Sequence, residues 1–169
     1  MKNNTESEFD PSQEVLATLN KYYDYLTSSD WKGLKSIYHP EAKFKDEIFE
    51  LKGRDQILAM WQMLMSRTQV KTIYAKVYEK NSTEGSGIWM PNYIFSGTKK
   101  EVTNVIVGQF KIQNGQIIEQ KDNFNLRVWM QQAFKPYGNL LYYFPFFRSF
   151  FKHQARKKLK IWIEKYQKS

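Results

Sequence analysis

Two aspartates interrupt apolar strand faces, and their chemistry is suited to proton transfer. In the segment AKFKDEIF, residues 42–49, strand alternation places Asp46 on the same apolar side as Phe44. The same alternation in QIIEQKDNFNL, residues 116–126, points Asp122 inward. Burying an ionised carboxylate is costly, so such a group is paired, hydrogen-bonded or placed in a cavity that a ligand fills. A raised pKa would let either aspartate accept or donate a proton near neutral pH.

A purely structural role for these aspartates stays open at the level of sequence. Each one could cap a turn or pair with an arginine such as Arg54 or Arg67, because structural partners also perturb the pKa of an acid. Two inward carboxylates on elements that a curved sheet can bring together raise the weight of a shared site. The pattern therefore supports a catalytic pair and structural caps about equally.

Other residue types exclude several kinds of site. The chain has no Cys and only two His, which excludes disulfides, thiolate nucleophiles and Cys-ligated metals. His39 precedes Pro40, where capping a helix end is the simpler role, and His153 falls in a basic segment. The glycines form no phosphate-binding loop. We therefore expect neither a metal nor a cofactor.

The net charge of +9 is concentrated at the C-terminal end of the chain. From Phe146 onward there are eight Lys or Arg and one acidic residue, Glu164. The rest of the chain is nearly balanced, so its charge does not predict a nucleic-acid partner.

The N-terminal stretch MKNNTESEFDP is polar and lacks the apolar core of a secretory signal, from which we expect a cytoplasmic protein. The longest apolar run, residues 140–147, is far shorter than the roughly 20 residues of a membrane-spanning helix.

Hydrophobic periodicity predicts helices followed by strands. We expect helices over residues 12–28, 31–38, 55–67 and 128–134, and strands over 42–49, 70–80, 86–97, 101–113 and 116–128. Pro91 lacks a backbone donor, which predicts a bulge or an edge position there. This order predicts an α+β domain with helices on one face of a curved antiparallel sheet.

The order of elements and two segments, SDWKGLKSIYHPEAKFKDEIFELKG and IIEQKDNFNL, resemble the NTF2-like superfamily, most of all its SnoaL-like polyketide cyclases and ketosteroid isomerases. The resemblance implies a cystatin-like α+β cone that encloses an apolar pocket. It divides the chain into a disordered leader (residues 1–11), an NTF2-like domain (12–128) and a C-terminal helical extension packed on the domain (129–169).

The resemblance also implies roles for particular residues. In ketosteroid isomerase a first-helix tyrosine donates to an oxyanion and an aspartate in the first strand is the base; the matching residues here are Tyr22 and Asp46. The second aspartate of that enzyme matches Gly108, which has no side chain to donate. In SnoaL-like cyclases the acid–base aspartate matches Asp122, and the usual histidine of that stretch is replaced by Gln120.

These roles predict a pocket that binds a small hydrophobic molecule, with acid–base chemistry of the isomerase, cyclase or hydrolase type. Asp46 would be the base, Asp122 the acid or second base, and Tyr22 the hydroxyl that orients the substrate. The expected apolar wall consists of Trp61, Met65, Tyr93 and Phe110. The alternative is a non-catalytic module that binds a ligand or a protein, which Gly108 and the missing histidine favour.

The C-terminal extension contains an amphipathic helix from Phe146 onward. Its apolar stripe is Phe147, Phe151, Ala155, Leu159, Trp162 and Tyr166, with Lys and Arg on the remaining surface. Three partners are open for this stripe: the helix's own domain, where it could cover the mouth of the cone, an anionic membrane surface, and, least favoured, nucleic acid. We also expect a homodimer through the outer sheet face, where Val105 and Val107 would otherwise face water.

Overall fold

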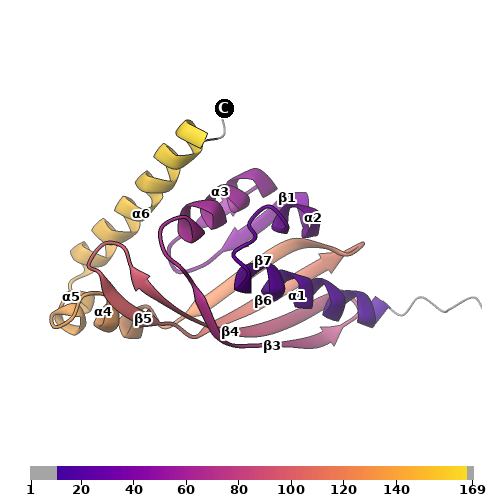
Figure 1. Ribbon diagram of the computed structural model, residues 1–169, viewed down its shortest axis with the longest axis horizontal. Helices are drawn as coiled ribbons and strands as arrows, with labels where there is room; N and C mark the ends of the chain where they lie inside the picture. The colour runs from indigo at the N-terminus through magenta and orange to yellow at the C-terminus, as the bar shows by residue number, and fades with distance from the viewer. Residues whose placement is uncertain (1–10, 167–169) are drawn as a thin grey trace, which may run out of the picture.

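The computed structural model describes residues 11–166 of the chain, which form helices packed on a curved sheet (Figure 1). The helices are α1 (Pro11–Thr27), α2 (Leu34–Ile37), α3 (Arg54–Met65), α4 (Leu126–Ala133), α5 (Gly138–Tyr143) and α6 (Pro145–Tyr166). The strands are β1 (Tyr38–Lys45), β2 (Glu50–Lys52), β3 (Lys71–Asn81), β4 (Glu84–Phe95), β5 (Lys100–Thr103), β6 (Ile106–Gln113) and β7 (Gln116–Phe124). The expected leader, residues 1–11, lies outside the described residues except for Pro11, which begins α1.

The sheet has the strand order β2-β1-β7-β6-β4-β3, and β5 pairs with the part of β4 that lies beyond the end of β6. Neighbouring strands run antiparallel, apart from β1 and β7, which pair in parallel with Phe44 opposite Gln120. The α+β architecture predicted from the sequence is confirmed, and the parallel pair is an addition to it. Hydrophobic alternation could not have predicted this pair, because alternation carries no information on strand direction.

The predicted strand over residues 101–113 is in fact two strands, β5 and β6, and both of them pair with β4. The partner of β4 is β6 as far as Trp89 and β5 from Asn92 onward. Pro91, which has no N–H to donate, lies at this change of partner. The register between β3 and β4 also shifts beside Pro91, but the extra residue is Ile73 on β3, so the bulge lies on the strand that faces Pro91.

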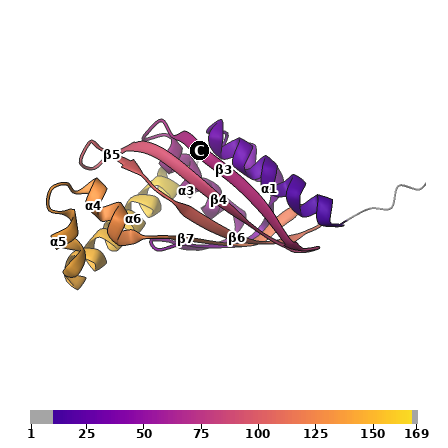
Figure 2. The ribbon, with the colours of Figure 1, turned by 90° about the horizontal axis from the view of Figure 1, so that it is seen from below.

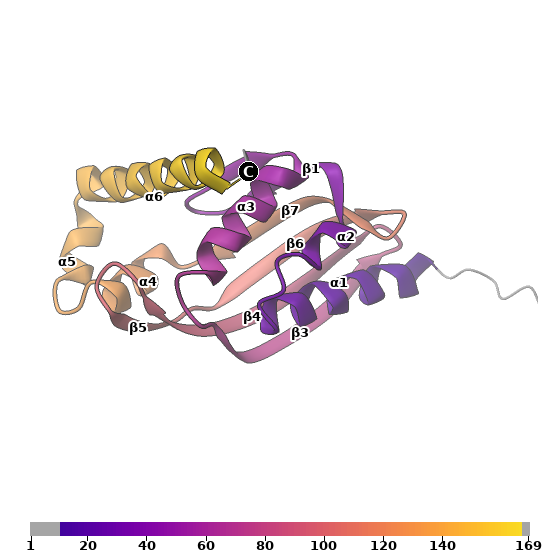
Figure 3. The same cartoon turned by 45° about the horizontal axis from the view of Figure 1, so that its top comes forward.

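Helices α1 and α3 cover one face of the sheet (Figures 2 and 3). The close approach of α1 depends on Gly87, because a Cβ there would lie 2.4 Å from the ring of Tyr23. Gly87 pairs with Gly108 on β6, where a Cβ would lie 2.6 Å from the ring of Phe110. The two facing glycines thus leave room for aromatic rings between α1 and the sheet.

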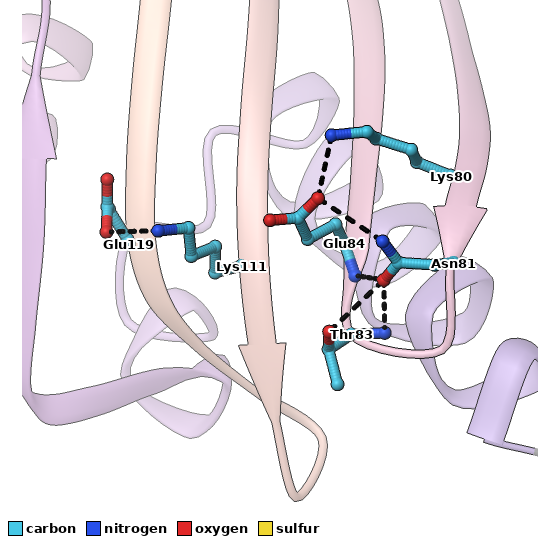
Figure 4. A network of polar contacts seen from close by, with 6 residues as sticks. All are labelled: Lys80, Asn81, Thr83, Glu84, Lys111 and Glu119. Atoms are coloured by element: carbon cyan, nitrogen blue, oxygen red, sulfur yellow. Dashed lines mark hydrogen bonds and ion pairs between the residues drawn. The ribbon is translucent and has the colours of Figure 1, made fainter.

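The outer face of the sheet is polar around the turn that joins β3 to β4 (Figure 4). The side-chain oxygen of Asn81 accepts hydrogen bonds from the backbone N–H groups of Thr83 and Glu84, both at 2.9 Å. On the neighbouring strands the ammonium of Lys111 lies 3.2 Å from the carboxylate of Glu119. This end of the outer face is therefore suited to contact with water.

The C-terminal helices bring the chain back to α3 and to the loop after β1. Helix α4 begins after Asn125, whose side chain accepts from the N–H of Val128 at 3.1 Å, and α6 then packs against α3 (Figure 3). The indole of Trp162 donates to Gln62 on α3 at 3.1 Å. Arg156 Nε donates to the carbonyl oxygen of Ile48 at 2.7 Å, which attaches α6 to the loop after β1.

Candidate functional site

A cavity of about 240 Å³ lies between α3, α6 and the inner face of the sheet. Its wall is mostly apolar and includes Phe44, Trp61, Met65, Trp89, Tyr93, Trp129, Phe151 and Ala155. Three of the four side chains predicted for the wall, those of Trp61, Met65 and Tyr93, lie in it. Both Asp46 and Asp122 also line this cavity, so the structure brings the two predicted carboxyl groups to one site.

Asp122 projects from β7 into the cavity and is only 7% exposed. One of its oxygens accepts a hydrogen bond from Gln120 Nε2 at 2.9 Å. Burial raises the pKa of the Asp122 carboxyl to about 7; the hydrogen bond from Gln120 acts against this shift, and the negative charge of Asp46 adds to it. Asp122 is therefore set to exchange a proton near neutral pH.

Gln120 holds Asp122 in place through a buried network of polar side chains. The Gln120 amide is 1% exposed, and its Nε2 also donates to the hydroxyl oxygen of Tyr22 at 2.8 Å. The hydroxyl of Tyr38 donates to the Gln120 oxygen and accepts from the indole of Trp61 at 3.4 Å. The amide nitrogen of Gln120 thus serves both Tyr22 and Asp122, and its oxygen serves Tyr38.

Gln120 and Tyr38 are site residues that the sequence did not predict. The signal for Gln120 was present, because the alternation that turns Asp122 inward also turns residue 120 inward. Tyr38 precedes the segment that was counted as a strand, and no spacing linked it to the site.

Asp46 reaches the cavity by a different route from the predicted one. Strand β1 ends at Lys45, and the Asp46 carboxylate accepts from the N–H groups of Ile48 and Phe49 at 2.7 and 2.5 Å. Its inward direction therefore comes from a turn, and strand alternation does not explain it. Such a turn is common at aspartate, whose short side chain can bind the backbone two residues on.

The environment of Asp46 nevertheless favours its protonated form more than water would. Burial raises its pKa to about 6, against the two backbone hydrogen bonds, which act to lower it. The charge of Glu47 raises this pKa further and that of Lys152 lowers it. Asp46 thus both caps a turn and presents a carboxyl group with a raised pKa to the cavity.

Tyr22 and Phe110 lie behind the cavity wall and do not line it. Their ring centroids are 5.2 Å apart in an edge-to-face arrangement, and the two side chains are 1% and 2% exposed. Phe110, predicted as part of the wall, instead packs in the core because facing glycines leave space for its ring. Burial raises the pKa of the Tyr22 hydroxyl well above its usual range. Gln120 connects that hydroxyl to Asp122 through two hydrogen bonds.

The arrangement can supply an acid and a base at the same time. Burial raises the pKa of Asp46 to about 6 and that of Asp122 to about 7, so both carboxyl groups can exchange protons near neutral pH. An apolar wall excludes water and strengthens electrostatic effects on a bound molecule. Across the described residues 11–166, no group of three His, Asp or Glu is placed to hold a metal ion.

Residues 19–120 match the family model of the SnoaL-like domain. The chain belongs to the SnoaL-like family. The matched range includes Tyr22, Asp46 and Gln120 and ends just before Asp122. No curated protein sequence gives a significant match. The predicted resemblance to SnoaL-like proteins is confirmed.

Solved structures share the fold of this SnoaL-like protein at low sequence identity. A proposed polyketide cyclase from Xanthomonas campestris pv. campestris is 14% identical with a TM-score of 0.67, over 73% of this chain and 98% of that one. An LEH-like epoxide hydrolase from M. tuberculosis is 13% identical with a TM-score of 0.61, over 78% and 97% of the two chains. A protein of ketosteroid isomerase-like fold from Catenulispora acidiphila, in complex with trimethylamine, is 13% identical with a TM-score of 0.62, over 70% and 93%. These identities establish the fold alone.

Proposed function

We propose that this SnoaL-like protein binds a small, largely apolar molecule in its cavity and performs acid–base chemistry on it. The observation that carries the proposal is the presence of two carboxyl groups with raised pKa values, Asp46 and Asp122, in one otherwise apolar cavity. Asp46 accepts a proton from the substrate and Asp122 donates one. Tyr22 acts as a positioning residue, because it holds Gln120, which in turn holds Asp122.

The reaction class that fits these groups is proton transfer at an activated carbon or oxygen, as in an isomerisation, a cyclisation or the addition of water. The proposed polyketide cyclase and the epoxide hydrolase that share the fold carry names from two of these classes. The cavity volume of about 240 Å³ is below the roughly 300 to 1,000 Å³ of pockets for drug-sized ligands. A short polyketide or a small terpenoid therefore fits the proposal better than a steroid does.

A non-catalytic binding role is the second candidate, and two observations favour it. The Asp46 carboxylate already accepts two backbone hydrogen bonds, and Gly108 cannot donate to an oxyanion. Loss of one oxyanion donor typically costs about 3 to 4 kcal/mol of transition-state stabilisation. Steroid isomerisation by the familiar route is therefore not part of the proposal.

Deuterium exchange tests the proposal without knowledge of the substrate. A panel of small cyclic ketones and β-keto esters is incubated with the protein in D₂O, and NMR measures deuterium uptake at the carbon beside the carbonyl. We expect the protein to accelerate exchange for at least one compound, and Asp46→Asn or Asp122→Asn to reduce that rate by about a hundredfold or more. Asp24→Asn, at an exposed position on α1, is the matched control and should have no effect.

Three outcomes of this experiment are informative. Exchange that depends on both aspartates supports catalysis. Binding seen as NMR shift changes, without exchange in any compound, supports the non-catalytic candidate. Absence of binding, together with titration of both carboxyl groups at the ordinary pKa of about 4, would overturn the proposal for this cavity.

A further inference from the structure

Six large apolar side chains between residues 137 and 150 face solvent, at the end of the molecule formed by α5 and the start of α6 (Figure 1). They are Tyr137 (67% exposed), Leu140 (59%), Tyr143 (59%), Phe144 (54%), Phe146 (84%) and Phe150 (50%). We call these six residues the aromatic surface. Single exposed apolar residues are ordinary, but a dense group of this kind indicates an interaction site.

Helix α6 has two faces, and each has a different role. The face with Phe147, Phe151 and Leu159 packs against the body of the protein. The opposite face carries exposed side chains at helical steps of three or four: Phe146, Phe150, His153, Lys157 and Lys160. The apolar stripe of α6, for which the sequence left a membrane open as a partner, therefore packs against the rest of the protein. The exposed side chains of Phe146 and Phe150 lie on the opposite face.

The surroundings of the aromatic surface are strongly basic. Residues 126–166 contain nine Lys or Arg and one acidic residue, Glu164. Lys135 is exposed just before the aromatic surface, and Lys157 and Lys160 continue the outward face of α6 after it. A partner for this region must therefore bring negative charge together with an apolar interior.

We propose that the aromatic surface and the cations beside it bind an anionic lipid membrane. Aromatic side chains locate at the boundary between headgroups and acyl chains, and Lys and Arg are attracted to acidic headgroups. A second copy of the chain is a poor occupant, because twofold contact would place two strongly basic segments face to face. No helix within residues 11–166 is long and apolar enough to cross a membrane.

The proposal is independent of the chemistry of the cavity, but the two features share α6. Phe151 and Ala155 of α6 line the cavity, and Phe150 on the opposite face belongs to the aromatic surface. A protein held at a membrane in this way has its cavity wall next to a source of apolar molecules.

Vesicle flotation with the full-length chain tests the proposal. The probes are vesicles of phosphatidylcholine alone and vesicles in which part of it is replaced by phosphatidylserine. We expect binding to the anionic vesicles at least about tenfold stronger than to the neutral ones. Binding should weaken as ionic strength rises from about 0.1 to 1 M, which shortens the Debye length from about 10 to 3 Å.

Two double variants assign the binding to this surface. Phe146→Ser with Phe150→Ser and, separately, Lys157→Gln with Lys160→Gln should each weaken binding to anionic vesicles by about tenfold or more. All four side chains are exposed, so the fold should be kept, and circular dichroism and thermal unfolding check this.

Matched controls change the same residue types on other surfaces. Ile73→Ser removes an exposed apolar side chain from β3, and Lys35→Gln with Lys121→Gln removes two exposed cations elsewhere. These controls should bind as the wild type does. Equal binding by all variants, or equal binding to neutral and anionic vesicles, would overturn the proposal. So would a loss of self-association in the phenylalanine variant without any effect on vesicles, because the surface would then join proteins.

Discussion

Replacing Asp122 by asparagine isolates the energetic effect of its buried carboxyl group. Asparagine has nearly the same shape and keeps an oxygen that can accept from Gln120 Nε2, so the 2.9 Å hydrogen bond survives. The substitution therefore removes the charge and leaves the packing of β7 intact. We expect Asp122→Asn to be more stable than the wild type at alkaline pH and similar to it in acid.

The size of this effect follows from the two pKa values of the carboxyl group. In the unfolded chain an aspartate titrates near 3.9, and burial in the folded protein raises the pKa of Asp122 to about 7. Below about pH 4 both states bind the proton, and stability does not depend on this group. Between about pH 4 and 7 only the folded state keeps it, so the free energy of unfolding falls by about 1.4 kcal/mol per pH unit. The accumulated loss by about pH 8 is roughly 4 kcal/mol.

Urea unfolding of the wild type and the variant, at about pH 5 and about pH 8, measures the difference. Between these values the free energy of unfolding should fall more steeply in the wild type than in Asp122→Asn, and the variant should be the more stable protein at the higher pH. Asp24→Asn, on the exposed side of α1, should follow the wild type at both. Parallel pH profiles for wild type and Asp122→Asn would refute the reasoning, because they would mean that the carboxyl group titrates alike in both states.

Three further predictions concern the same network and the sheet. Asp46→Asn removes a negative charge that raises the pKa of Asp122, so carbon-detected NMR should show that pKa falling; an unchanged value would contradict coupling within the cavity. Gln120→Leu removes the donor to Asp122 and leaves two buried tyrosine hydroxyls without this partner, so the pKa of Asp122 should rise and denaturation should show a loss of about 1 to 3 kcal/mol per unpaired group. A variant as stable as the wild type would argue against the network. We propose that the protein is a homodimer through the outer sheet face, where Val107 is 40% exposed, and expect Val107→Lys to be monomeric by light scattering; a wild type that is itself monomeric would count against this interface.

Much of the fold could be predicted from the sequence because helices and strands impose different periods on apolar residues. The helices α1 and α3 and the strands β3, β4 and β7 lie close to the predicted ranges. The inward direction of Asp122 also follows from alternation alone, since β7 is regular at that point. Where the backbone keeps the regular period of a helix or strand, residue type and position in the sequence are sufficient to predict which way a side chain points.

The predictions fail where the structure is decided by a side-chain hydrogen bond or by a strand that is distant in the sequence. Asp46 breaks the alternation by accepting hydrogen bonds from the next backbone N–H groups, a local interaction that competes with the strand. The run over residues 101–113 keeps its alternation across the division into β5 and β6, because that division comes from β4 changing its partner. Tyr38 joins the site through contacts with Gln120, which is 82 positions away in the chain, and no local pattern encodes such a contact.

The facing glycines of β4 and β6 limit how this protein could acquire new chemistry. A carboxyl group at position 108 would supply the second aspartate of a ketosteroid isomerase. Even a methyl group there, however, would lie 2.6 Å from the Phe110 ring and 3.1 Å from an Asp122 oxygen. A smaller side chain at position 110 would have to come first, and that step alone would remove the ring packed beneath Tyr22. A laboratory selection for steroid isomerisation starting from this sequence should therefore recover changes at 108 and 110 together, and a library that varies one position at a time should recover neither.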